Sequence, residues 1–270
     1  QHLGGQMKSI VRATPGKELK FEAEEGDALF VRSAARSMQV LAAFHGVSQP
    51  LSLGDIAKLS GLDRSAAQRI VHTLSKLDYL RRSSDDRGYL PGIRLLDHTL
   101  DVLRLDPLVQ KATPVLLELR RTLRERIDLS LFDDTRLIYA FRIQSKRETF
   151  YATLVGHSVP AYATAGGRAA LSLLSDDAVR AVLERSELLQ YTSDTRTDVD
   201  DILTQVQRAR SKGYALIVDE FLRGEVAIGT AIARDGVPIG AIHVAGSLSE
   251  WSPDEFEQQV APLAMEAARA

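Results

Sequence analysis

The sequence predicts a two-domain α+β protein, in which a small all-helical domain precedes a larger domain built on an antiparallel sheet. The first observation is residues 51–80, "LSLGDIAKLSGLDRSAAQRIVHTLSKLDYL", where apolar residues recur at the three-to-four spacing of helices. The second is a change to a period of two from about residue 127 onward, which is typical of strands. With 270 residues, the chain can build two ordinary domains.

Composition narrows the class of protein. An apolar fraction of 44% and a charged fraction of 26% are those of a soluble globular protein. No run of about 18 apolar residues occurs, so we expect no membrane partner. The absence of cysteine excludes disulfides, thiolate metal sites and a cysteine nucleophile, and it agrees with a cytoplasmic location.

The first predicted helix follows residues 1–29, which we interpret as a flexible arm. It lies in "VRSAARSMQVLAAFHG", with Ser33 as its N-cap and Gly46 at its end. Met38, Leu41 and Phe44 would form its apolar face.

Two further helices come next. Ser52 and Asp55 form a capping-box pattern that starts a helix ending near Ser60, with Gly61 after it. Asp63 is a good N-cap for a helix over residues 64–77. Two helices joined by a short turn with a glycine have the layout of a helix-turn-helix. The buried stripe of the second helix would be Ala67, Ile70, Val71, Leu74 and Leu77.

The opposite side of this second helix is polar. The second helix of a helix-turn-helix presents its N-terminal side chains to base edges in the major groove of DNA. Arginine and glutamine can make bidentate contacts to guanine and adenine. An ordinary solvated face is the alternative interpretation. The predicted base-contacting residues are Arg64, Ser65, Gln68, Arg69 and His72.

The stretch "DYLRRSSDDRGYLPG" predicts a short hairpin, or wing, with strands over 79–82 and 88–91. Arg81, Arg82 and Arg87 would meet DNA phosphates. Residues 30–94 carry ten Lys and Arg against five Asp, a charge of +5. Because the whole chain carries −2, the remainder carries −7. A basic module on an acidic body indicates a polyanion partner, so residues 30–91 are predicted to bind double-stranded DNA.

A linker helix is predicted over residues 92–106. Ile93, Leu96, Leu100 and Leu103 share one side of it, which would be a dimer seam or would pack in a core. A single winged domain buries little DNA surface, so specificity favours two half-sites and a homodimer, or a tetramer formed as a dimer of dimers.

The remaining residues, 107–270, predict the α+β domain. Its first helix carries Pro114 as a kink or restart. Hairpins are expected around Asp133-Asp134 and Asp235-Gly236. Further strands are expected at about 149–155 and in "YALIVDE", and further helices at about 164–174, 176–185, 199–212 and 253–268.

The stretch "YATAGGRAAL" is a candidate ligand site. Thr164 can cap a helix whose first turn holds Gly166 and Gly167, and free N–H groups there suit a carboxylate. Tight packing of this helix on the sheet is the alternative. The late hairpin is also rich in small residues, which leave room for either a cavity or a helix. These residues are Ala227, Gly229, Ala231 and Ala241, beside His243, which is more often a core histidine than a ligand contact.

Four blocks of the chain together resemble the isocitrate lyase regulator (IclR) family of bacterial transcription factors. They are "VRSAARSMQVLAAF", "SLGDIAKLSGLDRSAAQRIVHTLSKLDYL", "VPAYATAGGRAALSLL" and "KGYALIVDEFLRGEVAIGTAI". The resemblance covers about residues 30–268. It implies an N-terminal winged helix-turn-helix, a linker helix and a GAF-like effector-binding domain in a ligand-responsive regulator of palindromic operators.

The resemblance also implies an effector between the Gly-rich helix start and the sheet. Several relatives respond to small organic or aromatic acids, so an acid is expected. Glu220 would lie in a loop over the pocket, and Arg142 and Arg168 are candidate carboxylate partners, although a surface position is favoured for both. The implied effector-binding residues are Tyr151, Ala165, Gly166, Glu220, Ala227, Ala241 and His243.

Two other functions stay open. The C-terminal domain could serve only for oligomerisation. A hydrolase could use Ser130, Ser158, His157 and Asp219, but no G-x-S-x-G, H-E-x-x-H or P-loop motif accompanies them. We therefore expect no catalytic residues, no metal and no cofactor.

Overall fold

The computed structural model describes residues 27–144 and 155–270. The chain divides into two compact units, Gln1–Val102 and Leu103–Ala270. The two-domain α+β organisation predicted from the sequence is therefore confirmed, and the division falls inside the predicted linker helix. None of the helices in the described part is long and apolar enough to cross a bilayer.

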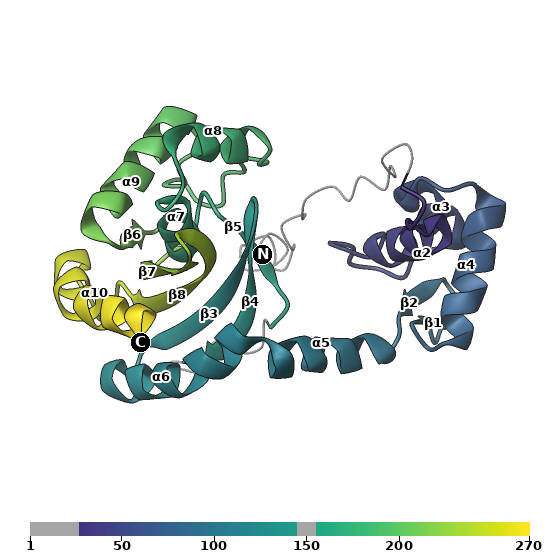
Figure 1. Cartoon of the computed structure of the whole chain (residues 1–270), viewed down its shortest axis with the longest axis horizontal. Coiled ribbons are helices and arrows are strands. Elements are labelled where there is room, and N and C mark those ends of the chain that lie inside the picture. Colours follow the sequence, from purple (N-terminus) through teal and green to yellow (C-terminus); the bar gives the residue numbers. More distant parts are fainter. Residues whose placement is uncertain (1–26, 145–154) are drawn as a thin grey trace. The chain divides into compact units, whose positions relative to one another are not determined.

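The N-terminal unit contains three packed helices and a two-stranded antiparallel wing (Figure 1). Val40, Ile56, Val71 and Leu80 are at most 1% exposed and form the centre of its core. Each element contributes one apolar face, so the packing fixes which side of each helix meets solvent. The elements are α2 (Arg32–Ala42), α3 (Leu53–Ser60), α4 (Arg64–Lys76), β1 (Leu80–Arg82) and β2 (Tyr89–Pro91).

Local capping signals determine both ends of α3 and the start of α4, as the sequence predicts. The Ser52 hydroxyl accepts from the Asp55 N–H at 3.1 Å, and Gly61 ends α3 at a φ of 69°. The Asp63 carboxylate accepts from the Ala66 N–H at 2.9 Å and starts α4. Such caps satisfy backbone groups that the helix itself leaves unpaired.

Three predicted details of this unit are wrong. The first helix begins earlier than Ser33, because the N–H groups of Ala34 and Ala35 already bond to the carbonyl of Val31. Met38 is 52% exposed, and the neighbouring Val40 takes the buried position instead. Leu77 is 55% exposed because α4 has ended by that point and the helical period no longer applies.

The helix α5 (Arg94–Leu105) starts against the end of α4. A Cβ on Gly92 would lie 1.9 Å from the carbonyl oxygen of Asp78, so only glycine allows this approach. The ring of Tyr79 stacks on that of His98, and its hydroxyl contacts Nε2 of the same histidine. None of the twelve residues of α5 is buried, and Leu96 and Leu100 are more than 60% exposed.

The C-terminal unit is a six-stranded antiparallel sheet in the order β5-β4-β3-β8-β7-β6, with helices on both faces (Figure 1). One core joins α6 and α10 to the sheet, and a second joins the other face to α7, α8 and α9. The strands are β3 (Arg126–Asp133), β4 (Arg136–Ile143), β5 (Ser158–Pro160), β6 (Ala215–Val218), β7 (Glu225–Arg234) and β8 (Val237–Ser247). The helices are α6 (Pro107–Leu123), α7 (Ala165–Leu171), α8 (Asp176–Glu184), α9 (Val199–Lys212) and α10 (Pro253–Arg269).

Both hairpins occur where the sequence predicts them. Asp134 has a φ of 55°, and Asp235 and Gly236 have φ of 52° and 78°, as tight hairpin turns require. The predicted strand at 149–155 falls almost entirely outside the described residues. β5, which follows it, was not predicted, and Pro114 lies inside an unbroken α6.

Candidate functional site

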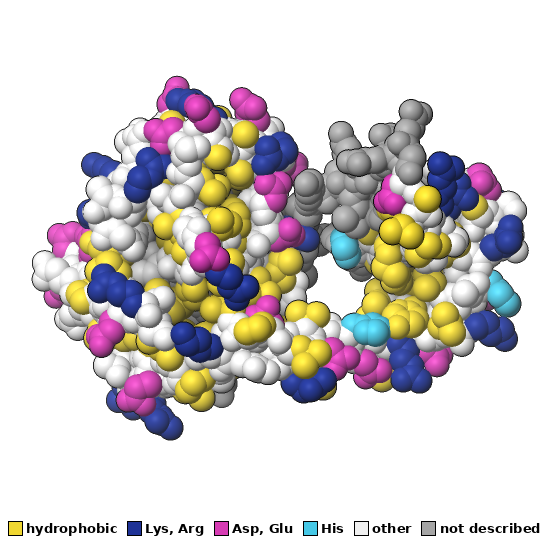
Figure 2. All heavy atoms as spheres, viewed as in Figure 1, with side chains coloured by type: hydrophobic (Ala, Val, Ile, Leu, Met, Phe, Trp, Pro, Cys, Tyr) yellow, Lys and Arg dark blue, Asp and Glu magenta, His cyan; other side chains and the backbone are white. Residues whose placement is uncertain are grey.

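The polar face of α4 is exposed along its length. Ala67, Val71 and Leu74 hold the helix on the core, so the opposite side faces solvent. Figure 2 shows Lys, Arg and His side chains along the edge of the N-terminal unit where Figure 1 places α4. None of these polar side chains has a hydrogen bond or ion pair to another described residue. They are the predicted base-contacting residues Arg64, Ser65, Gln68, Arg69 and His72.

The wing arginines differ from one another in their partners. Arg82 contacts Asp86 at 3.2 Å, and Arg87 contacts Asp85 at 2.5 Å. Arg81 has no ion pair within the described part of the chain. The sequence analysis missed this pairing, which neutralises two of the three charges. Exposed pairs of this kind contribute little, so a phosphate can replace the carboxylate.

In the C-terminal unit, two glycines allow α7 to pack directly on β7 and β8, and a third, Gly167, allows it to pack on the segment that follows β5. A Cβ on Gly166 would lie 2.2 Å from Nε2 of His243, and one on Gly229 would lie 2.1 Å from the carbonyl carbon of Ala165. A Cβ on Gly167 would lie 2.2 Å from the carbonyl oxygen of Ala161. All seven residues of α7 are buried. Tight packing, the alternative considered in the sequence analysis, therefore accounts for these glycines.

Thr164 does not cap α7 with its side chain. Its hydroxyl donates to the Pro160 carbonyl at 2.8 Å instead. The N–H groups at the start of α7 thus lie at a buried packing surface.

Five of the predicted effector residues come together where α7 meets the sheet. Ala165 packs with Ala227 in one small cluster, and Gly166 lies against His243. The fifth residue, Ala241, is linked to His243 through Ser130. The Ser130 hydroxyl lies 2.7 Å from Nε2 of His243 and 3.3 Å from the Ala241 carbonyl oxygen. Tyr151 lies outside the described residues.

Buried charges surround this face of the sheet. Asp128 accepts from Nε of Arg142 at 2.6 Å and from Nε of Arg126 at 3.2 Å, and Arg126 also contacts Glu225 at 2.7 Å. The Arg142 side chain is 4% exposed, so a surface position for it was wrong. Although burial alone would raise the pKa of Asp128, the two guanidinium groups hold it below its usual value.

His243 and Tyr139 in this site are neutral near pH 7. Burial lowers the pKa of His243 from 6.5 to about 4. Burial also raises the pKa of Tyr139, whose ring lies edge-on to His243, to about 12. The site therefore offers hydroxyl groups and an uncharged imidazole, and its arginines are already paired with carboxylates.

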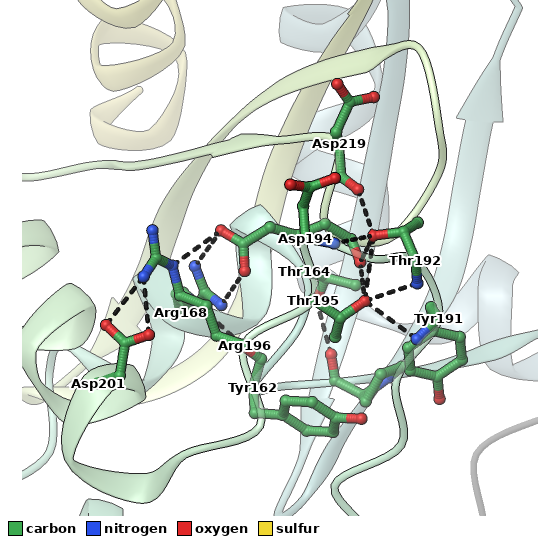
Figure 3. A network of polar contacts seen from close by, with 12 residues as sticks. Tyr162, Thr164, Arg168, Tyr191, Thr192, Asp194, Thr195, Arg196, Asp201 and Asp219 are labelled. Atoms are coloured by element: carbon green, nitrogen blue, oxygen red, sulfur yellow. Dashed lines mark hydrogen bonds and ion pairs between the residues drawn. The ribbon is translucent and has the colours of Figure 1, made fainter.

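Glu220 belongs to a different network, shown in Figure 3. Its carboxylate accepts from Nη1 and Nη2 of Arg168 at 2.8 and 2.5 Å, and Arg196 lies 3.4 Å away. Arg168 is 1% exposed and also donates to the Tyr162 carbonyl, so the predicted surface position was wrong. Hydroxyls of Thr192 and Thr195 fix the backbone of the Glu220 loop. Glu220 anchors this loop to α7, and no local sequence signal reveals a partner 52 residues away.

The residues of the hydrolase alternative have other partners. Ser130 bonds to His243, and the Asp219 carboxylate accepts from the N–H of Gly224 at 2.5 Å. Nor does any group of three or more His, Asp and Glu in the described ranges have the arrangement of a metal site. Ser130 and Asp219 thus bond to partners outside the four residues of that alternative.

Two family models match the chain. Residues 33–84 match the "IclR helix-turn-helix domain", and residues 100–270 match "Bacterial transcriptional regulator IclR C-terminal". Together they cover α3, α4 and the first wing strand of the N-terminal unit, the second half of α5 and the whole C-terminal unit.

Individual proteins agree with these models. The Pca regulon regulatory protein of Pseudomonas putida is 30% identical over 267 residues, covering 97% of this chain and 90% of that protein. An IclR family transcriptional regulator from Brucella abortus superposes with a TM-score of 0.77 at 22% identity, covering 94% and 97% of the two chains. An IclR homolog from Microbacterium hydrocarbonoxydans, solved in complex with 4-hydroxybenzoate, has a TM-score of 0.68 at 21% identity and covers 88% and 96%.

Proposed function

Because the chain belongs to the IclR family of bacterial transcriptional regulators, we propose that it is a ligand-responsive regulator of a palindromic operator. The exposed face of α4, which has polar side chains without partners among the described residues, is the observation that carries the DNA-binding half of this proposal. Its N-terminal side chains would contact base edges, and the wing would contact phosphates. The protein would act in the cytoplasm, without catalysis.

We propose a homodimer, or a dimer of dimers, as the active form. One winged domain contacts too little DNA for strong specificity, and two-fold symmetry supplies a second half-site. The exposed apolar side chains of α5 support a seam there, because leaving Leu96 and Leu100 in water forgoes their burial. Met38 of α2, whose side chain is also exposed, would take part in the same dimer contact.

The proposed effector is a small organic acid, with aromatic acids foremost. The homolog solved with 4-hydroxybenzoate supports this class. The binding site would lie where α7 meets the sheet, near Gly166 and His243, with Tyr151 added from outside the described residues. Because Gly166 already touches the His243 ring, the acid must displace α7 to enter. Displacing α7 would give the ligand different affinities for two arrangements of the protein, as regulation requires.

In a second candidate function, the C-terminal unit serves only for oligomerisation. The close packing of α7 on β7 and β8 favours it. Calorimetry with 4-hydroxybenzoate and other small acids, with and without DNA, separates the two candidates. Heat of binding that changes with DNA supports the sensor, and no heat with any acid supports the module.

Selection of duplexes from a random-sequence pool tests the DNA-binding function. We expect the wild-type chain to enrich sites with two related half-sites in inverted order. Enrichment of no sequence, together with weak and uniform binding to all duplexes, would reject an operator-specific regulator.

A further inference from the structure

A hollow of about 490 Å³ lies between α4 and the wing. It belongs wholly to the N-terminal unit and includes three predicted base-contacting residues, Gln68, Arg69 and His72, beside three residues that have no assigned role. Successive turns of α4 form one wall, and Tyr89 of β2 closes the other. The lining residues are Gln68, Arg69, His72, Thr73, Ser75 and Tyr89.

Several polar groups in the hollow have no partner. The Ser75 hydroxyl is buried and makes no hydrogen bond. The Tyr89 hydroxyl and the Arg69 guanidinium also bond to no other described residue. The Thr73 hydroxyl is different, because it donates to the Arg69 carbonyl at 3.0 Å. Because the Ser75 oxygen is closed off from solvent, the Tyr89 hydroxyl and the Arg69 guanidinium are the groups that can donate to a ligand in the hollow without rearrangement.

The wing adds a positive charge at the rim of the hollow. Arg82 and Tyr89 are opposite each other in the β1–β2 register, and the Arg82 guanidinium lies 4.4 Å from the centre of the Tyr89 ring. The carboxylate of Asp86, which pairs with Arg82, belongs to a side chain that is 84% exposed, so it can move away. The Tyr89 hydroxyl, together with Arg69 and Arg82, suits an anion with several acceptor oxygens.

We propose that this hollow binds one backbone phosphate of the operator, with the Tyr89 hydroxyl as donor. The inference builds on the proposed function, because DNA must lie along α4. It requires the DNA strand that borders the major groove to pass between α4 and the wing. A phosphate held there fixes the depth and register of α4 without reading sequence. Tyr89 is thus a positioning residue for the base contacts of Gln68 and Arg69.

The substitution Tyr89→Phe tests the proposal with the full chain. It removes the hydroxyl and keeps the ring that packs in the core and supports Arg82. The probe is a duplex selected from the random pool by the wild-type chain, with single phosphates replaced in turn by uncharged methylphosphonate. We expect binding of the unmodified duplex to weaken roughly tenfold, with unchanged base preference. The salt dependence should also be unchanged, because no charge is lost.

The methylphosphonate series identifies the phosphate. In the wild type, substitution at one position in each half-site should weaken binding. In Tyr89→Phe, that same position should matter much less, because its partner hydroxyl is absent. Arg82→Gln should lower the salt slope by about one.

Tyr79→Phe is the matched control. Tyr79 is the other tyrosine of this region, and its hydroxyl contacts His98 away from the hollow. This variant should keep the full penalty at the sensitive phosphate. Thermal melting of each variant checks that the wing is folded.

Three outcomes would overturn the proposal. They are wild-type affinity in Tyr89→Phe, an undiminished penalty at every phosphate in that variant, or an altered base preference. Arg69→Ala separates this failure from failure of the proposed function. If Arg69→Ala loses base preference while Tyr89→Phe is neutral, only the phosphate contact is rejected. If no variant changes DNA binding, the assignment of α4 is rejected as well.

Discussion

The two units place arginine in opposite environments. In the C-terminal unit Arg142 and Arg168 are buried, and each faces a carboxylate within 2.6 Å. In the N-terminal unit Arg64, Arg69 and Arg81 are exposed, with no ion pair to any described residue. A buried guanidinium needs a partner, whereas an exposed one remains available to a polyanion. The comparison teaches that burial beside a carboxylate, rather than the number of charges, distinguishes an arginine that holds the fold from one that remains available to a polyanion.

The largest expected effect comes from breaking a buried pair. Glu220→Ala leaves the Arg168 guanidinium buried without its carboxylate, so the free energy of unfolding should fall by about 3–5 kcal/mol. Urea denaturation measures this. In the control Arg180→Ala, which breaks an exposed pair with Asp200, the loss should stay below about 1 kcal/mol. Equal losses in the two variants would contradict the comparison.

The next effect concerns pH. Burial lowers the pKa of His243 from 6.5 to about 4, so the unfolded chain binds a proton in this range that the folded chain does not. The contribution of His243 to the free energy of unfolding is therefore fully present above pH 6.5. It is lost as the pH falls toward 4, and the loss should be about 3 kcal/mol. His243→Gln should flatten this slope in denaturation curves recorded across the range. An unchanged slope would mean that another group causes it.

For the exposed side chains of α4, the loss of a single base contact should change the overall affinity for DNA less than it changes the preference for one base over another. Gln68→Ala and Arg69→Ala should each relax preference at one base by about 1–3 kcal/mol, because a bidentate contact is lost. Competition binding with single-base variants of the selected duplex measures this. Neither substitution should change the free energy of unfolding beyond about 0.5 kcal/mol, since both side chains are exposed.

The smallest effect is expected at the wing. Arg81→Ala should weaken binding to all duplexes alike and lower the salt slope by about one, as for one lost phosphate contact. Arg87→Ala should do less, because Asp85 already neutralises Arg87. A larger effect at Arg87 would show that the wing pairs open fully on DNA.

The sequence predicted the elements whose signals are local. Capping residues such as Asp63 identified the start of α4, and the Asp235-Gly236 turn identified the late hairpin. Prediction failed where contacts between residues far apart in the sequence determine the structure. The sequence does not reveal that Glu220 bonds to Arg168, or that the space beside Gly166 is filled by His243. β5, with only three residues, has too short a pattern to detect.

The central claim is that the unpaired face of α4 reads DNA sequence. Its most direct test compares the wild type with the triple variant Gln68→Ala, Arg69→Ala, His72→Ala, by measuring affinity for the selected duplex and for a scrambled one. We predict that the triple variant keeps the wild-type melting temperature and weak binding to both duplexes, and loses the preference between them. Unchanged affinity and preference in the triple variant would contradict the claim.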